Sequence, residues 1–267
     1  MNRIDEVFKR AREQAQKVFI PFVTAGDPDL DMTRDLVLML EKSGADIIEL
    51  GVPFSDPLAD GPVIQRASQR ALSGGINLRR ICRFVQGMRK DTKVPIALMS
   101  YYNPILHMGL ESSIELMKGA GVDGLICPDL PPEEGEELLG LANQNGMACI
   151  FFLAPTSTKE RIKMVAERST GFIYYVSVTG VTGAREDLPS TIKDHIKQIR
   201  SLTDKPIAVG FGVSKPEQAA RIAQWADGVI VGSAIIRILE ESHFSEDGIT
   251  RIGEYVSQIK HAMETRP

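Results

Sequence analysis

The chain of 267 residues is weakly acidic, with a net charge of −4, and 43% of its residues are hydrophobic. Its length suits either two small domains or one α/β barrel of about 250 residues. It has no basic stripe with interleaved aromatic residues, which excludes a nucleic-acid surface, and no run approaches the roughly 18 apolar residues that a membrane helix needs.

Cysteine and histidine usage indicates a cytoplasmic protein without a metal site. The cysteines, Cys82, Cys127 and Cys149, are odd in number and far apart, which is typical of reduced thiols rather than of a disulfide framework. The four histidines are scattered without ligand spacing, and the first residues contain no apolar signal core.

Taken in chain order, short apolar runs alternate with amphipathic segments, after one helix expected at residues 3–16. The predicted strands are 18–23, 46–50, 95–99, 123–127, 148–153, 172–176, 206–209 and 227–231. The helices predicted between and after them are 31–43, 62–73, 78–90, 111–119, 134–144, 158–168, 190–202, 216–224 and 246–263. We expect the segment 100–104 to be a closing loop.

This alternation predicts parallel strands with helical crossovers. Similar tripeptides, Gly44-Ala45-Asp46, Gly121-Val122-Asp123 and Trp225-Ala226-Asp227, enter three of the strands and form a faint internal repeat. None of the strands has the charged or bulged character of a sheet edge, which favours closure. We therefore expect an α/β protein with one domain over residues 1–267, a (β/α)8 TIM barrel with an extra N-terminal helix.

The segment from Glu49 to Pro62 organises the expected site. It begins with a carboxylate where a buried strand ends, and it continues through prolines and glycines that shape a loop. Asp60 lies at the far end of this loop. Catalytic groups of such barrels lie at the carboxyl ends of the strands, so Glu49 and Asp60 are candidates for acid–base chemistry. The alternative is a strand-ending glutamate and a solvated loop aspartate.

The loops after the last three strands are rich in glycine. They contain Gly180, Gly183, Gly210, Gly212 and Gly232, with Ser233. The bare backbone N–H groups there, with a helix beginning after Ser233, predict a phosphate site. Tight turns would explain the same glycines. Apolar and aromatic residues at strand ends suit a flat apolar group beside the phosphate: Phe22, Met99, Tyr101, Ile126, Phe152, Tyr174 and Phe211. These residues alone leave an isomerase and a lyase equally open.

Several motifs resemble those of the tryptophan synthase alpha subunit family over residues 4–260. They are the run from Glu49 to Pro62, Pro21-Phe22-Val23-Thr24-Ala25-Gly26-Asp27-Pro28, Tyr101-Tyr102-Asn103-Pro104, Asp129-Leu130-Pro131-Pro132-Glu133-Glu134, Ala154-Pro155-Thr156-Ser157, Tyr175-Val176-Ser177, Gly180-Val181-Thr182-Gly183 and Gly210-Phe211-Gly212-Val213-Ser214. The resemblance implies a lyase of tryptophan biosynthesis that cleaves indole-3-glycerol phosphate to indole and glyceraldehyde 3-phosphate by a retro-aldol reaction.

The resemblance also assigns roles to residues. Glu49 matches the catalytic glutamate, and Asp60 matches the acceptor of the indole N–H. Backbone groups of Gly183, Gly212, Gly232 and Ser233 hold the phosphate in the family, and no cofactor is needed. Thr182 belongs to the loop 177–189, which we expect to close over the site and to reach Asp60.

The family resemblance implies a partner, a beta subunit that receives the indole and makes L-tryptophan in an alpha2beta2 heterotetramer. Phe54, Asp56, Asn103 and Pro131 match the docking face. Three alternatives stay open: a free-standing lyase that releases indole, a non-catalytic regulatory subunit, and a phosphosugar isomerase on a similar barrel.

Overall fold

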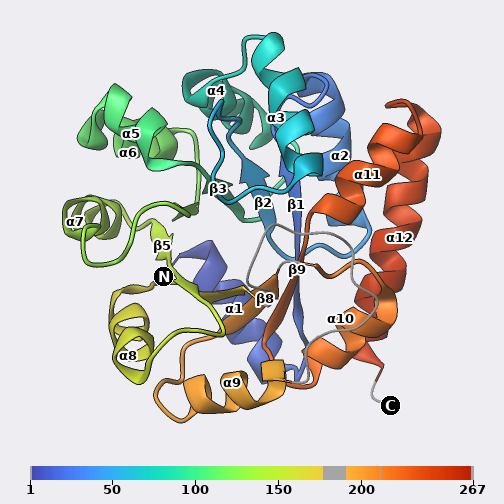
Figure 1. Cartoon of the computed structure of the whole chain (residues 1–267). Coiled ribbons are helices and arrows are strands. Elements are labelled where there is room, and N and C mark those ends of the chain that lie inside the picture. The colour runs from blue at the N-terminus through green and yellow to red at the C-terminus, as the bar shows by residue number, and fades with distance from the viewer. Residues whose placement is uncertain (1, 177–190, 211, 266–267) are drawn as a thin grey trace.

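The chain forms a ring of parallel strands inside a layer of helices (Figure 1). The computed structural model describes residues 2–176, 191–210 and 212–265. The strands are β1 (Val18–Thr24), β2 (Ile48–Gly51), β3 (Ile96–Met99), β4 (Gly124–Ile126), β5 (Ala148–Ile150), β6 (Phe152–Leu153), β7 (Ile173–Val176), β8 (Ile207–Gly210) and β9 (Gly228–Val231). They follow the order β5-β4-β3-β2-β1-β9-β8-β7-β6, with all pairs parallel.

The ring closes through a single chain segment. β5 pairs with β4, β6 pairs with β7, and only Phe151 separates β5 from β6. The expected strand 148–153 is therefore one strand that bends at Phe151, whose carbonyl still accepts a hydrogen bond from the Tyr174 N–H at 3.0 Å. The predicted TIM barrel is confirmed.

The helices lie close to their expected positions, with one addition. They are α1 (Arg3–Glu13), α2 (Leu30–Lys42), α3 (Pro62–Ser73), α4 (Leu78–Met88), α5 (Tyr102–Met108), α6 (Leu110–Gly119), α7 (Glu136–Gln144), α8 (Lys159–Arg168), α9 (Thr191–Arg200), α10 (Pro216–Ala223), α11 (Ser233–Glu241) and α12 (Glu246–Glu264). The expectation of a loop over 100–104 was wrong, because α5 begins at Tyr102 and Pro104 falls in its first turn, where proline breaks no helical hydrogen bond. No helix in the described ranges is long and apolar enough to cross a membrane.

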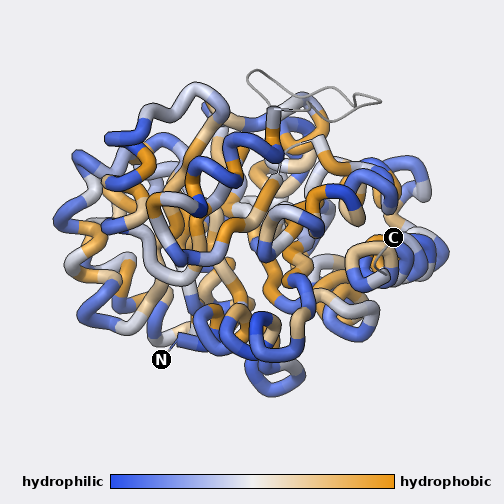
Figure 2. The backbone as a smooth tube through the Cα atoms, turned by 90° about the horizontal axis from the view of Figure 1, so that it is seen from below, coloured by the Kyte–Doolittle hydropathy of each residue, from blue (hydrophilic) through white to orange (hydrophobic). Residues whose placement is uncertain are grey.

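Two apolar layers hold the barrel together. One lies between the strands and the surrounding helices and includes Phe19 and Val23 of β1. The other fills the inside of the ring with the alternate residues of the same strand, Val18, Ile20 and Phe22. Figure 2 shows hydrophobic positions within the molecule and hydrophilic positions along the outer helices. Ile4, Val7 and Phe8 of α1 also pack into this inner layer. The mouth at the carboxyl ends of the strands is therefore the one that remains for chemistry.

Four equivalent clamps stand before four of the strands, three of them at the aspartates of the repeated tripeptides and the fourth at Thr170. In each clamp, a residue before one strand donates its N–H to the carbonyl of a residue in the preceding strand and accepts that residue's N–H on its side-chain oxygen. The pairs are Asp46 with Phe19, Asp123 with Ile96, Thr170 with Cys149 and Asp227 with Ile207, with side-chain N···O distances of 2.7, 2.8, 2.8 and 2.7 Å. These clamps fix the register of strand pairs, which accounts for the repeat.

Candidate active site

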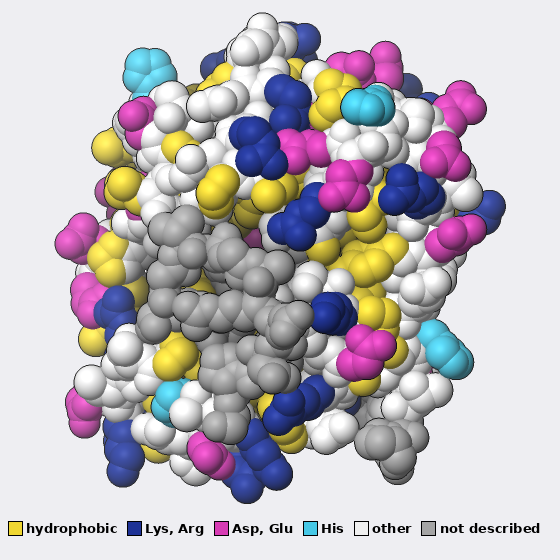
Figure 3. Space-filling model, turned by 45° about the vertical axis from the view of Figure 1, so that its right-hand side comes forward, with side chains coloured by type: hydrophobic (Ala, Val, Ile, Leu, Met, Phe, Trp, Pro, Cys, Tyr) yellow, Lys and Arg dark blue, Asp and Glu magenta, His cyan; other side chains and the backbone are white. Residues whose placement is uncertain are grey.

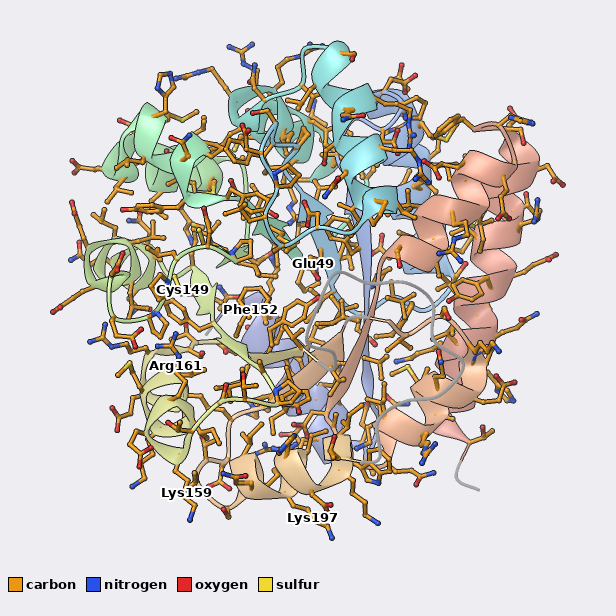
Figure 4. The ribbon with its side chains drawn as sticks, viewed as in Figure 1. Glu49, Cys149, Phe152, Lys159, Arg161 and Lys197 are labelled. Carbon is orange, nitrogen blue, oxygen red and sulfur yellow. The ribbon has the colours of Figure 1, made fainter. Side chains whose placement is uncertain are left out.

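Glu49 lies inside the barrel near the carboxyl end of β2 (Figure 4). The strand register places it between Phe22 of β1 and Ala97 of β3. Its side chain is fully buried, and neither carboxyl oxygen has a hydrogen-bond partner among the described residues. Burial first, and the nearby charge of Asp60 second, raise the pKa of Glu49 from 4.5 to about 8. Glu49 therefore carries a proton at neutral pH and can donate it.

Asp60 is held over the barrel by the aromatic side chain of Tyr101. The Tyr101 hydroxyl accepts the Ala59 N–H at 2.9 Å, and it is near enough to the Asp60 carboxyl group to lower its pKa. The Phe54 ring stacks on the Tyr101 ring with 5.2 Å between centroids, so the loop is anchored at two points. Desolvation raises the pKa of Asp60 to about 6, and the Tyr101 hydroxyl opposes that rise. Asp60 is therefore ionised at neutral pH.

The two carboxyl groups line one hollow with most of the predicted binding residues. Phe22, Met99, Tyr174, Gly212, Gly232 and Ser233 all line it. Tyr101 lines an adjoining hollow with Asp60 and Met99. Ile126 pairs with Met99 in the sheet and is buried in the inner layer without lining either hollow. Thr182, Gly183 and Phe211 lie outside the described residues, as does the expected closing loop.

Residues that the sequence did not single out complete the wall. Gly61, Ile64, Val213 and Ile230 also line the hollow. Ile64 follows Asp60 by one helical turn, so the segment that carries the carboxylate also contributes an apolar contact. Helical spacing after the loop was the one signal that could have identified Ile64 in advance.

The Phe22 ring packs against two glycines, Gly51 and Gly232. A Cβ atom at Gly51 would lie 2.6 Å from the Phe22 ring, and a Cβ at Gly232 would lie 3.1 Å from it. Side chains there would therefore displace the ring, so these glycines are required for the shape of the apolar wall.

Backbone N–H groups gather beside that wall at the start of α11. Gly232 is the N-cap residue and makes no side-chain capping bond, which leaves the first turn of the helix available to an anion. Gly212 adopts φ 83°, a conformation that favours glycine, and lines the same hollow. A phosphate bound here would share the hollow with the Glu49 and Asp60 carboxyl groups.

The described residues contain no group of three or more His, Cys, Asp or Glu side chains that could hold a metal ion. All three cysteines are buried free thiols, and burial raises the pKa of the Cys127 thiol well above its ordinary range. A thiolate at Cys127 would be unfavourable, and this argues against a nucleophilic role.

Comparisons with known proteins agree with this geometry. A family model described as "Tryptophan synthase alpha chain" matches residues 8–264. The chain is 49% identical over 265 residues to the tryptophan synthase alpha chain of Rippkaea orientalis, with 99% of each chain covered. It is 50% identical over 261 residues to that of Geotalea uraniireducens, with 97% of each covered.

Solved structures are similar in fold. Tryptophan synthase subunit alpha from Legionella pneumophila superposes with a TM-score of 0.90 at 38% identity, covering 99% of both chains. A chain of Mycobacterium tuberculosis tryptophan synthase gives a TM-score of 0.91 at 36% identity, again covering 99% of both.

Proposed function

The chain belongs to the tryptophan synthase alpha chain family, and from that premise we propose that it cleaves indole-3-glycerol phosphate with Glu49 as the proton-transfer residue and Asp60 as its electrostatic partner. The activity of the family is that of a carbon–carbon lyase, and the products are indole and glyceraldehyde 3-phosphate. The assignment of the two roles rests on one observation: two buried carboxyl groups share a hollow, and their pKa values are about 8 and about 6. Carboxyl groups whose environments separate their pKa values divide into an acid and an ionised partner.

Protonation of the indole ring is the first step of the reaction. Glu49 holds a proton at neutral pH, and it donates this proton to C3 of the ring, which leaves the ring positively charged. The Asp60 carboxylate accepts a hydrogen bond from the ring N–H and stabilises that charge, an effect that is strong in a site shielded from water.

Cleavage of the carbon–carbon bond uses the same two residues, Glu49 and Asp60. The ionised Glu49 now accepts the proton of the hydroxyl group next to the ring, and that carbon becomes the aldehyde. The electrons of the broken carbon–carbon bond return to the ring, which leaves as neutral indole. Glu49 regains its proton, so the cycle closes without a cofactor. Acid–base help of this kind contributes about 10²–10⁴ in rate.

The remaining substrate contacts are assigned by position. Phe22, Met99 and Tyr174 provide the wall for the indole ring. The start of α11, with Gly212, Gly232 and Ser233, receives the phosphate. We also assign Tyr101 to the binding of the ring, through Asp60, and Ile126 to support of Met99. Thr182, Gly183 and Phe211 keep the roles that the family resemblance implies.

A beta subunit is the expected partner, and we place its docking face around the loop that carries Asp60. Two large hydrophobic side chains of the described residues are exposed, Leu58 on this loop at 86% and Leu106 on α5 at 54%. The Phe54–Tyr101 stacking joins this loop to the start of α5, and Asp56 and Asn103 are exposed beside them. We propose an alpha2beta2 complex in the cytoplasm, where the reduced cysteines would persist.

Indole release by the purified chain tests the proposal. We expect free indole from indole-3-glycerol phosphate when the chain acts alone, and less free indole when a beta subunit and its amino-acid co-substrate are added, because the indole is then consumed. Unchanged indole release with a beta subunit present would favour the free-standing lyase. No indole under either condition would contradict the proposed function.

A further inference from the structure

Four charged side chains form one connected network beside the candidate site. Arg70 of α3 forms two hydrogen bonds to Asp27, at 2.6 and 2.8 Å. The same guanidinium donates to Glu240 of α11 at 2.7 Å. Arg66, one turn earlier in α3, donates to the other carboxyl oxygen of Glu240 at 2.7 Å. Glu240 therefore joins two successive turns of α3 to α11, and Arg70 extends the network to the loop after β1.

The network is partly shielded from water and well supported. Asp27 is 3% exposed, the Glu240 side chain 16% and the Arg70 side chain 29%. The Phe244 ring lies 5.1 Å from the Arg70 guanidinium carbon and covers one of its faces. Figure 3 shows charged side chains of both signs mixed on the face that carries α11 and α12. Bidentate arginine pairs in such surroundings restrict geometry more than exposed pairs do.

The two helices that this network joins carry the two ends of the site. α3 begins at Pro62, directly after Asp60 and Gly61, and the Gln65 side chain donates to the Asp60 carbonyl at 2.9 Å. α11 begins at Ser233, where the phosphate is expected. The helices pack against each other and against β1, and Figure 1 shows them side by side. A shift of α3 against α11 therefore changes the separation between the Asp60 carboxylate and the phosphate cradle.

We propose that Glu240, held by Arg66 and Arg70, is a positioning residue that sets the spacing between the indole-binding carboxylate and the phosphate cradle. This inference rests on the proposed function. A ligand that reaches both ends of the hollow depends on this spacing, whereas a ligand that occupies the phosphate end alone does not. Small errors in such placement have large kinetic effects, about 10²-fold for displacements near 1 Å.

Binding of two ligands to the complete chain separates this role from a structural one. Glycerol 3-phosphate occupies the phosphate end alone, and an indole joined to phosphate through a three-carbon chain spans both ends. Glu240→Gln removes the charge that holds α3 to α11 but leaves the Arg70–Asp27 pair intact, so buried Asp27 keeps its partner. Asp91→Asn is the matched control, since it breaks the exposed pair between Arg34 and Asp91, 3.1 Å apart, away from the site.

We expect Glu240→Gln to bind glycerol 3-phosphate as the wild type does and to bind the spanning ligand about tenfold more weakly, within the range of measured couplings between contacting groups. The kcat for indole-3-glycerol phosphate should fall by about tenfold or more, and Asp91→Asn should change none of these values. A lower melting temperature with unchanged spanning-ligand affinity and kcat would overturn the proposal. So would an equal loss of affinity for both ligands, which would place Glu240 in support of the phosphate cradle alone. The wild type serves as the reference, because its failure to cleave the substrate would reject the proposed function itself.

Discussion

Replacing the Glu49 carboxyl by an amide should make the protein progressively more stable than the wild type as the pH rises. In the folded protein the pKa of Glu49 is raised from 4.5 to about 8, mainly by burial. Between these two pH values Glu49 is ionised in the unfolded chain but still protonated in the folded protein. Folding there therefore requires the uptake of a proton, which becomes more costly as the pH rises. The contribution of Glu49 to stability is therefore complete below about pH 4.5 and is lost as the pH rises through about 8. Glu49→Gln has no proton to lose.

The magnitude follows from the interval between the two pKa values. That interval, from 4.5 to about 8, is about 3.5 pH units, and each unit corresponds to about 1.4 kcal/mol. The full difference approaches about 5 kcal/mol, of which about 4 kcal/mol develops between pH 5 and pH 9. The change with pH is the meaningful quantity, because the constant cost of burying the amide cancels from it.

Urea unfolding of both proteins at pH 5, 7 and 9 measures this quantity. We expect the stability difference, Glu49→Gln minus wild type, to increase by about 4 kcal/mol over this range, with most of the change above pH 5 and below pH 8. Glu137→Gln, at an exposed position in α7, is the control for replacing a carboxyl outside the barrel. A difference that stays constant with pH would show that Glu49 titrates near its ordinary value and would refute the reasoning.

Three further predictions concern the residues around Glu49. Asp60→Asn should lose most activity yet unfold at the same or a higher temperature above pH 6, because the pKa of buried Asp60 is raised to about 6; a melting point lower by many degrees would make Asp60 structural. Tyr101→Phe removes the hydroxyl that lowers the pKa of Asp60, so the lower limb of the pH–rate profile should move to higher pH, and an unmoved profile would contradict that influence. Gly212→Val should weaken the binding of glycerol 3-phosphate. It should also destabilise the chain by about 1 kcal/mol or more, because the backbone φ of 83° is unfavourable for valine. If titration calorimetry gave an unchanged affinity for glycerol 3-phosphate, the anion would bind elsewhere.

Much of the barrel could be predicted from sequence because its signals are local. Apolar runs of strand length, amphipathic helices and prolines or glycines at their ends recur with little interruption, and α3 begins and ends at the expected residues. The bend at Phe151 could not be predicted, because closing the ring depends on two different neighbouring strands. α5 was missed because a proline in a first helical turn and a proline in a loop look alike in sequence.

The site was predictable in its residue types and less so in its spatial relations. A carboxylate ending a buried strand identified Glu49, and a shaped loop identified Asp60. That both oxygens of Glu49 are buried without a described partner depends on packing from several strands. The contacts of Glu240 with Arg66 and Arg70 join residues about 170 positions apart, so no local sequence pattern predicts them.

Turnover by Glu49→Gln, measured together with ligand binding, tests the central claim most directly. We predict that indole formation falls by about 10²–10⁴ or more, because the amide can neither donate nor accept the proton. The spanning indole phosphate should still bind with nearly wild-type affinity, because the apolar wall and the start of α11 are unchanged. Indole formation at the wild-type rate by this variant would contradict the assignment of Glu49 as the residue that transfers the proton.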